Sequence, residues 1–337
     1  MGAGASEVYL HIGRGKAGSS TVQSLADTHG AYMQSIGVFC PLTLHGLSNN
    51  ARLASALERP GTDRPTIKKF RKDLVRSPSP KMLVSAEAFH GLTSEGLARL
   101  KRLLGDRQVH ILFYVRDYPG WLPSRYAQGT KKATNLDDFD RYLERNRDGI
   151  PVVARLENWA QVFGWPSMHV RPLDTANLFG GDLVADVFRA MGIEAPAPPV
   201  SRQNESPHWM TLEVMRELAI RLAPDRAPDS RSVRAIRRVI EEAVAMEPRR
   251  TPYLTRSQWQ WLADLYRADI DRLGGYMGRT FPLALAAPEG ERQFLPSFGA
   301  ISREIRDGIR ARLAGSPHTQ RIDPGIASVL DGMLAHG

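Results

Sequence analysis

The feature that most constrains the fold is the segment over residues 8–25, in which an apolar run passes through glycines into hydroxyl side chains. Residues 8–12 have the composition of a buried strand, and the three glycines between 13 and 18 allow the main chain to turn tightly. Residues 19–21 then open a helix, whose N–H groups and positive dipole end favour a phosphate or sulfate. Lys16 adds a full positive charge, so the segment predicts a strand, an anion-binding loop and a helix, in that order.

Two nucleotide-binding patterns compete for this loop. The phosphate-loop pattern of NTPases fits poorly, because Ser19 stands where its lysine has to be. Gly13, Gly15 and Gly18 match the dinucleotide-binding glycine pattern, but that pattern also needs an acidic residue about 20 positions on, and residues 36–41 contain none. The loop is instead distinguished by a lysine two residues before Gly18 and hydroxyls directly after it.

A second anion-binding residue is expected at the end of another strand. Residues 109–115 form an apolar, β-branched and aromatic run, long enough for a buried strand and too short for an ordinary helix. Arg116 follows directly, and the next segment starts a helix that contains Ser124. Ligands of open α/β sheets bind at the carboxyl ends of strands, and a guanidinium offers a fork of donors that matches phosphate oxygens. Arg116 is therefore a candidate phosphate ligand.

A third strand candidate, residues 81–85, leads into two candidate general bases, Glu87 and His90. A positioned carboxylate or imidazole can take the proton of an attacking hydroxyl, which contributes roughly 10²- to 10⁴-fold in rate. We place Glu87 first and His90 second. The stretch over residues 41–55, with Asn49 and His45, is expected near the same open edge of the sheet.

At these segments the chain resembles the sulfotransferases that use 3′-phosphoadenosine 5′-phosphosulfate (PAPS), and in particular their bacterial, carbohydrate-type branch. The first loop of that family commonly reads Pro-x-Lys-Thr-Gly-Thr-Thr. This chain has Lys-Ala-Gly-Ser-Ser-Thr over residues 16–21, with Gly15 in place of the proline and Ala17 in place of the first threonine. The family also pairs an Arg that closes a strand with a Ser eight positions later, as Arg116 and Ser124 do here. The likeness covers residues 7 to about 285, most clearly in these short stretches.

The resemblance implies transfer of a sulfuryl group from PAPS to a hydroxyl of a glycan, lipid or small metabolite, with release of adenosine 3′,5′-bisphosphate. Lys16 would neutralise the departing phosphate, and Glu87 or His90 would be the base. The donor-binding residues it implies are Arg14, Gly15, Lys16, Ala17, Gly18, Ser19, Ser20, Thr21, Arg116 and Ser124. A nucleotide-dependent kinase or dehydrogenase, and a non-catalytic anion- or glycan-binding module, stay open as alternatives.

Composition narrows the partners. The net charge of +9 favours anionic ligands, but the basic residues are scattered, and the runs at 68–72 and 231–238 read as solvated helix faces, so we expect no nucleic acid partner. Cys40 is the only cysteine and the nine histidines lack metal-ligand spacing, so no disulfide or metal site is expected. No stretch reaches the ~20 apolar residues of a membrane helix, and we expect a cytoplasmic protein.

The order of elements predicts an α/β chain, in which a P-loop-like central parallel sheet is flanked by helices and followed by a helical C-terminal region. Residues 1–285 are expected to form the α/β domain, with a helical subregion from about 200 to 285. Residues 286–337 are expected to form a C-terminal helical tail, and three roles stay open for it: capping the active site, contacting a neighbouring subunit in a homo-oligomer, or packing on the back of the domain.

Overall fold

The computed structural model describes residues 4–42, 49–198, 207–222, 228–248, 252–281, 285, 290 and 292–336. The chain forms two compact units, each built from three separate stretches. The first unit contains Met1–Asp117, Pro151–Gln203 and Asp264–Leu285, and the second contains Tyr118–Ile150, Asn204–Ala263 and Ala286–Gly337. The domain division that we expected, with residues 1–285 in one domain and residues 286–337 in a tail, stays a prediction.

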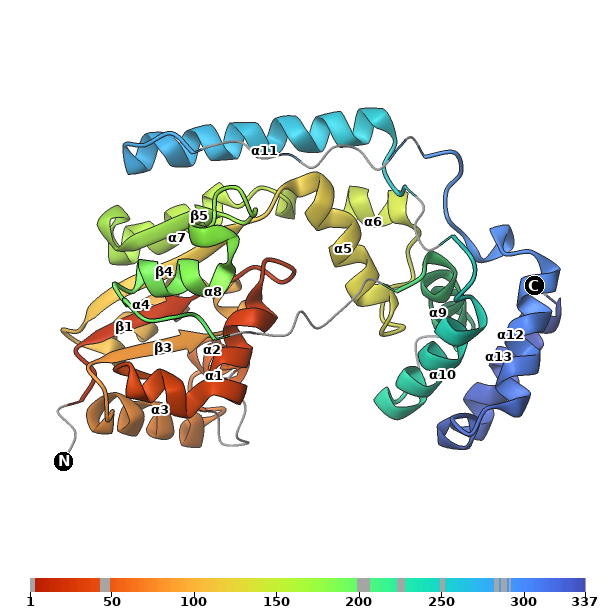
Figure 1. Cartoon of the computed structure of the whole chain (residues 1–337), viewed down its shortest axis with the longest axis horizontal. Coiled ribbons are helices and arrows are strands. Elements are labelled where there is room, and N and C mark those ends of the chain that lie inside the picture. The colour runs from red at the N-terminus through yellow and green to blue at the C-terminus, as the bar shows by residue number, and fades with distance from the viewer. Residues whose placement is uncertain are drawn as a thin grey trace. The chain divides into compact units, whose positions relative to one another are not determined.

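The first unit is built on a parallel sheet (Figure 1). Its five strands are β1 (Glu7–His11), β2 (Val38–Phe39), β3 (Lys81–Ser85), β4 (Gln108–Val115) and β5 (Met168–Pro172). Their order across the sheet is β2-β3-β1-β4-β5, and all four neighbouring pairs are parallel. In the register of the central strands, His11 lies opposite Ser85 on one side and Leu112 on the other. The predicted α/β fold class is thereby confirmed.

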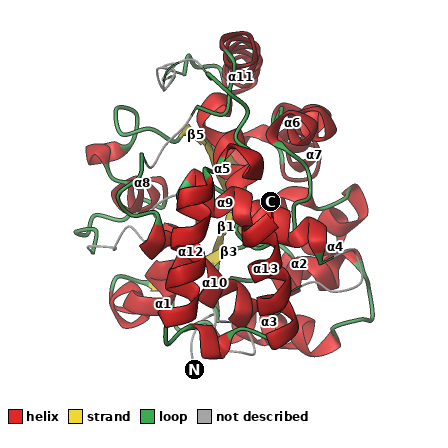
Figure 2. Ribbon diagram, turned by 90° about the vertical axis from the view of Figure 1, so that its right-hand side faces the viewer, coloured by secondary structure: helices red, strands yellow, loops and turns green. Residues whose placement is uncertain are grey.

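Helices cover both faces of this sheet, as Figure 2 shows for α1 and α8 on one side of the strands and α2, α4 and α7 on the other. Leu83, Leu112 and Tyr114 share a buried apolar cluster with residues of α1 and α8. The helices of this unit are α1 (Ser19–Ser35), α2 (Ala51–Glu58), α3 (Arg64–Arg76), α4 (Ser94–Leu104), α7 (Val153–Phe163) and α8 (Leu183–Ala190). Short 3₁₀ turns are η1 (Glu87–Gly91), η3 (Trp165–Ser167) and η4 (Phe179–Gly181).

Burial on both faces explains why β1, β3 and β4 contain runs of consecutive apolar residues. Four consecutive residues of β1 and the last five of β4 are buried. The third predicted strand, residues 81–85, has the same bounds as β3, and the run at 109–115 lies within β4. Arg116 therefore follows the last buried residue of β4, as the sequence indicated.

The second unit is helical. It contains α5 (Tyr118–Thr130), α6 (Phe139–Asn146), α9 (Trp209–Arg221), α10 (Ser230–Ala243), α12 (Arg303–Gly315) and α13 (Pro324–His336), with η2 (Arg147–Gly149), η5 (Phe298–Ala300) and η6 (Thr319–Arg321). The long helix α11 (Arg256–Met277) begins in this unit and ends in the first. Apolar residues of α9, α10, α12 and α13 share one buried cluster, so the C-terminal helices are part of this core.

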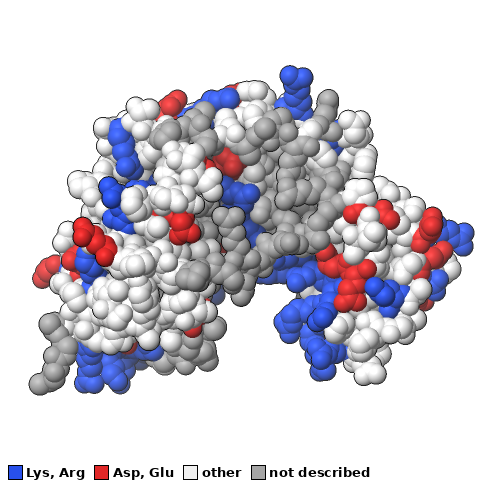
Figure 3. All heavy atoms as spheres, in the orientation of Figure 1, with Lys and Arg blue, Asp and Glu red and all other residues white. Residues whose placement is uncertain are grey.

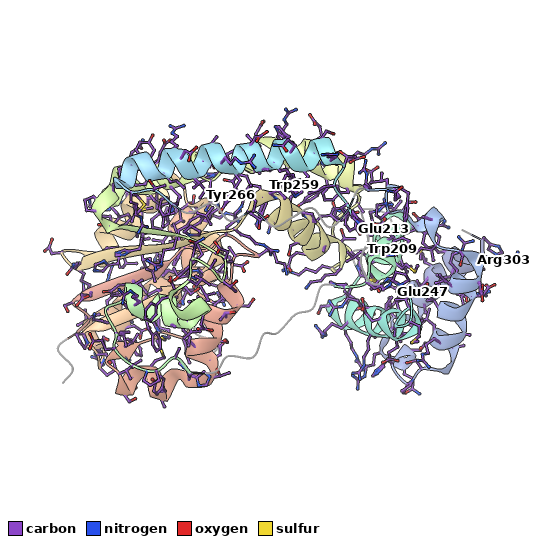
Figure 4. The ribbon with its side chains drawn as sticks, turned by 45° about the horizontal axis from the view of Figure 1, so that its top comes forward. Trp209, Glu213, Glu247, Trp259, Tyr266 and Arg303 are labelled. Atoms are coloured by element: carbon purple, nitrogen blue, oxygen red, sulfur yellow. The ribbon has the colours of Figure 1, made fainter. Side chains whose placement is uncertain are left out.

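A buried ionic group lies inside that helical core. Glu213, on α9 beside Trp209 (Figure 4), has no exposed surface. Its carboxylate accepts hydrogen bonds from the Tyr126 hydroxyl at 3.2 Å and from Arg216 Nε at 2.8 Å. Burial raises the pKa of Glu213, while Arg216 opposes that shift.

The described helices include none with the length and apolar character needed to cross a membrane.

Candidate functional site

The topology of the sheet locates the ligand-binding edge. The chain leaves β1 toward β2 and β3 on one side, whereas it leaves β4 toward β5 on the other. Neighbouring parallel strands whose connections diverge in this way open a crevice at their carboxyl ends, where ligands of α/β sheets bind. The loop after β1 and Arg116 after β4 both lie at that switch point. Arg116 Nη1 donates a hydrogen bond to the carbonyl oxygen of Lys16 at 3.2 Å, so the structure brings these two predicted residues together.

Backbone conformation marks the loop as a special one. Lys16 has φ 70°, and Lys16 and Ala133 are the non-glycine residues with positive φ among those that the structure describes. The left-handed region costs an L-residue roughly 1–2 kcal/mol, and such strain is concentrated at ligand sites. Gly18 has φ 79°, and a Cβ there would lie 2.4 Å from Leu183 Cδ2. The loop is therefore held in a tight conformation, in which a side chain at Gly18 would strain the backbone and displace the end of Leu183.

The amino-terminal end of α1 is prepared for an anion. Its N-cap residue, Gly18, supplies no side-chain hydrogen bond, and the first turn of α1 contains no acidic residue. The positive end of the helix dipole is thus left without a carboxylate from its own first turn, which favours an external phosphate or sulfate. Lys16 is half-buried beside it, and Arg14 is 8% exposed.

The predicted donor-binding residues differ in accessibility. Ala17 and Ser19 are buried, Gly15 and Thr21 are half-buried, and Ser20 is exposed. The backbone N–H of Ala17 donates to the carbonyl oxygen of Arg14 at 3.1 Å, which closes the turn before the helix. Gly15, Lys16 and Thr21 are thus accessible from solvent, while Ala17 and Ser19 pack inward.

The two candidate bases lie on η1, directly after β3. Glu87 is half-buried at the first position of this turn, one residue after Ala86, whose N–H donates to the carbonyl oxygen of His11 at 3.1 Å. This bond ties the start of η1 to the end of β1. The His90 ring stacks on Phe113 of β4, with centroids 5.4 Å apart. In the sheet register Phe113 alternates with Leu112, the partner of His11, so His90 lies against the opposite face of the sheet from the His11 side chain.

Ser124 lies on α5, eight residues after Arg116, and is half-buried. Arg116 belongs to the first unit and Ser124 to the second. Their joint role as a phosphate site stays a prediction.

The stretch expected near the open edge reaches the carboxyl end of β3. Asn49 forms a bridge with Ser85, and the N–H of Asn50 donates to the Ser85 carbonyl oxygen at 3.0 Å. His45 lies outside the described residues. This stretch therefore borders the same edge as Glu87 and the anion loop.

Sequence reasoning missed two residues at this edge, His11 and Ser85. They end β1 and β3, and His11 Nδ1 lies 2.8 Å from Ser85 Oγ. The signal that could have found His11 is a histidine inside an otherwise apolar strand run.

Other basic side chains gather on helix surfaces of both units. Figure 3 shows Lys and Arg side chains gathered over α3 in the first unit and over α10 in the second. Lys68, Arg71 and Lys72 of α3 are exposed, as are Arg231 and Arg234 of α10. Among the residues that the structure describes, no group of three or more His, Cys, Asp or Glu is placed to hold a metal ion.

Comparisons with known proteins give distant matches. No protein-family model matches the chain. A protein of Archaeoglobus fulgidus described as uncharacterized is 30% identical over 141 residues, which is 41% of this chain and 38% of that protein. The chain thus spans well under half the length of that relative.

Among solved structures, the chain is similar to the crystal structure of a sulfotransferase from Alicyclobacillus acidocaldarius. That likeness has a TM-score of 0.45 and 14% sequence identity, and it covers 81% of this chain and 96% of the other. At that identity no residue role is transferred from one chain to the other.

Proposed function

We propose that this chain is a PAPS-dependent sulfotransferase, which transfers a sulfuryl group to an acceptor hydroxyl and releases adenosine 3′,5′-bisphosphate. The observation that carries the proposal is the hydrogen bond from Arg116 to the carbonyl oxygen of Lys16, across 100 residues of sequence. It supports a site for two anionic groups, because it joins a cationic loop at a helix N-terminus to a guanidinium at the switch point of the sheet.

The residues present fit such a donor. The loop from Arg14 to Thr21 would hold its 5′-phosphosulfate, since Gly18 lets the backbone approach closely and no carboxylate in the first turn of α1 repels an anion. Arg116 would hold the 3′-phosphate through charge-assisted hydrogen bonds.

The donor supplies an electrophilic sulfur bonded to a phosphate oxygen. Glu87 takes the proton of the acceptor hydroxyl as the acceptor oxygen bonds to sulfur. Lys16 neutralises the negative charge left on the phosphate oxygen when the bond from sulfur to that oxygen breaks. His90 is the second candidate for the base.

Nucleotide-dependent kinases and dehydrogenases are less well supported by the site. Ser19 occupies the position of the kinase-type lysine, and β2 ends at Phe39, followed by Cys40 and Pro41 where a dinucleotide fold would have its ribose-binding acid.

Isothermal titration calorimetry with adenosine 3′,5′-bisphosphate, ATP with Mg²⁺, and NAD in parallel tests the proposal. Arg116→Ala is expected to weaken bisphosphate binding by about 1–3 kcal/mol, the scale of a lost charge-assisted hydrogen bond. Arg102→Ala, which removes an exposed arginine of α4, is the matched control and should bind like the wild type. Binding of ATP or NAD without bisphosphate binding at about 100 μM would refute the proposal.

A turnover assay separates an enzyme from a non-catalytic anion-binding module, which would form no product. Incubation with PAPS and pooled acceptor hydroxyl compounds, followed by mass spectrometry, should reveal products heavier by one SO₃. The same screen would identify the acceptor class.

A further inference from the structure

His11 is a fully buried polar residue at the centre of the site's framework. It is the last residue of β1 and has no exposed surface. Its Nδ1 lies 2.8 Å from the hydroxyl of Ser85, the last residue of β3, and its own carbonyl oxygen accepts from the N–H of Ala86. One residue thus joins the strand that enters the anion loop to the strand that leads into Glu87.

The other edge of the imidazole lies against the anion loop. A Cβ built on Gly13 would lie 2.6 Å from His11 Cε1, 2.7 Å from His11 Nε2 and 2.8 Å from Ser19 Oγ. The ring and the Ser19 hydroxyl therefore crowd around the Cα of Gly13, which explains why this position has no side chain. Because the ring lies directly against Gly13, a change in its orientation would move the loop.

A buried imidazole is less stabilising than an apolar ring would be if His11 only filled space in the core. Nε2 is buried and has no hydrogen-bond partner among the described atoms. An unsatisfied buried polar atom destabilises the fold, whereas an apolar ring would fill the same space without that penalty. Burial also lowers the pKa of His11 to about 4, so the ring is neutral at neutral pH and leaves the positive charge of the site to Lys16, Arg14 and Arg116.

We propose that His11 is a positioning residue, whose imidazole is oriented by Ser85 and sets the anion loop in register with β3, the strand that leads into Glu87. The identity of the ligand that the anion loop binds rests on the proposed function. The polar Nδ1 edge fixes the ring through Ser85, and the opposite edge lies against Gly13, whose other neighbour is the hydroxyl of Ser19, the first residue of α1. The anion-binding N–H groups are then preorganised before a ligand arrives, which reduces the ordering cost of binding.

Four variants separate this role from simple core packing. His11→Phe keeps an aromatic ring but removes both nitrogens, and Ser85→Ala removes the group that orients the ring. His11→Asn retains a polar atom near the Nδ1 position. His110→Phe is the matched control, because His110 lies on β4 in the same sheet, opposite Tyr9 toward the amino end of the strands.

Dissociation constants for adenosine 3′,5′-bisphosphate and for inorganic pyrophosphate, measured by calorimetry, are the readout, with melting temperature recorded beside them. We expect His11→Phe and Ser85→Ala to weaken both ligands about tenfold or more, and His11→Asn to recover most of that loss. His110→Phe should change the melting temperature but leave both constants within about twofold.

Unchanged constants in His11→Phe and Ser85→Ala, or an equal loss in His110→Phe, would reduce His11 to a core residue and overturn the inference. The two proposals can fail separately. If the wild type binds pyrophosphate but not the bisphosphate, the PAPS proposal fails, while the effect of the variants on pyrophosphate still decides the role of His11.

Discussion

Replacing Gly18 by alanine tests whether the anion loop depends on its left-handed glycine. Gly18 has φ 79°, and moving an L-residue into that region costs about 1–2 kcal/mol. The new Cβ would also lie 2.4 Å from Leu183 Cδ2. Because that atom is the far end of a flexible, half-buried side chain, displacing it adds only about 1 kcal/mol, the low end of the cost of overpacking.

The free energy of unfolding should therefore fall by roughly 2–3 kcal/mol, measured by urea denaturation with unchanged m-value. A double-mutant cycle with Leu183→Ala separates the two causes. The double variant should recover the steric part, about 1 kcal/mol, and keep the backbone part. Bisphosphate affinity should fall in both Gly18→Ala proteins, because the first turn of α1 follows this residue directly.

Gly30→Ala is the matched control in the same helix. A Cβ at Gly30 meets no atom within 4 Å, and its φ is not in the left-handed region. This variant should be as stable as the wild type or more stable by up to about 1 kcal/mol, since alanine favours helix. Equal stability of Gly18→Ala and the wild type would refute the reasoning about the loop.

Three further perturbations have defined outcomes. Glu87→Gln should leave bisphosphate affinity unchanged and lower turnover by about 10²-fold or more, measured as bisphosphate released from PAPS once an acceptor is known. Asp186→Asn should lower the free energy of unfolding by about 3–5 kcal/mol, because it leaves the Arg171 guanidinium without the buried carboxylate that it contacts. Acid should destabilise the protein, because burial lowers the pKa of His11 and of His169 to about 4, and the unfolded chain binds protons near pH 6.5 that the folded chain does not. The stability that the neutral rings contribute is fully present above pH 6.5 and is lost as the pH falls toward 4, which urea denaturation at stepped pH would measure.

For each of these three perturbations, a control variant or a contrary result tests the stated physical cause. Asp264→Asn weakens an exposed ion pair with Arg267 and should change stability by less than about 1 kcal/mol. His169→Gln should flatten the acid side of the stability profile, and an unchanged profile would contradict the assignment. Full turnover of Glu87→Gln would move the base to His90.

Much of the first unit could be predicted from local sequence. The central strands are buried on both faces, so β3 and β4 contain the apolar runs Met82–Val84 and Ile111–Val115, and the end of the β4 run places Arg116 at the carboxyl edge. The strand β2 has only two residues and no such run, so it could not be predicted from local sequence. It is defined by its pairing with β3.

The parts that could not be predicted depend on contacts distant in sequence. The second unit joins three separated stretches, because the apolar faces of α9 and α10 pack with those of α12 and α13, and helical periodicity says that a face is apolar but not what covers it. The left-handed backbone conformation of Lys16 could not be predicted either. Positive φ is usual for glycine, and the neighbouring Gly15 and Gly18 were the expected positions for it.

The hydrogen bond between Arg116 and Lys16 has a consequence for the order in which the protein assembles. It closes a loop of 100 residues, and the contact between His11 and Ser85 closes one of 74. Closing such a loop costs chain entropy before the stabilising contacts form, and parallel sheets fold slowly for that reason. The first strand of the chain is central in the sheet, so during synthesis it must wait for both neighbours. Under the proposed function, bisphosphate affinity is expected to appear only after β1, β3 and β4 have paired, and its appearance during refolding would time that pairing.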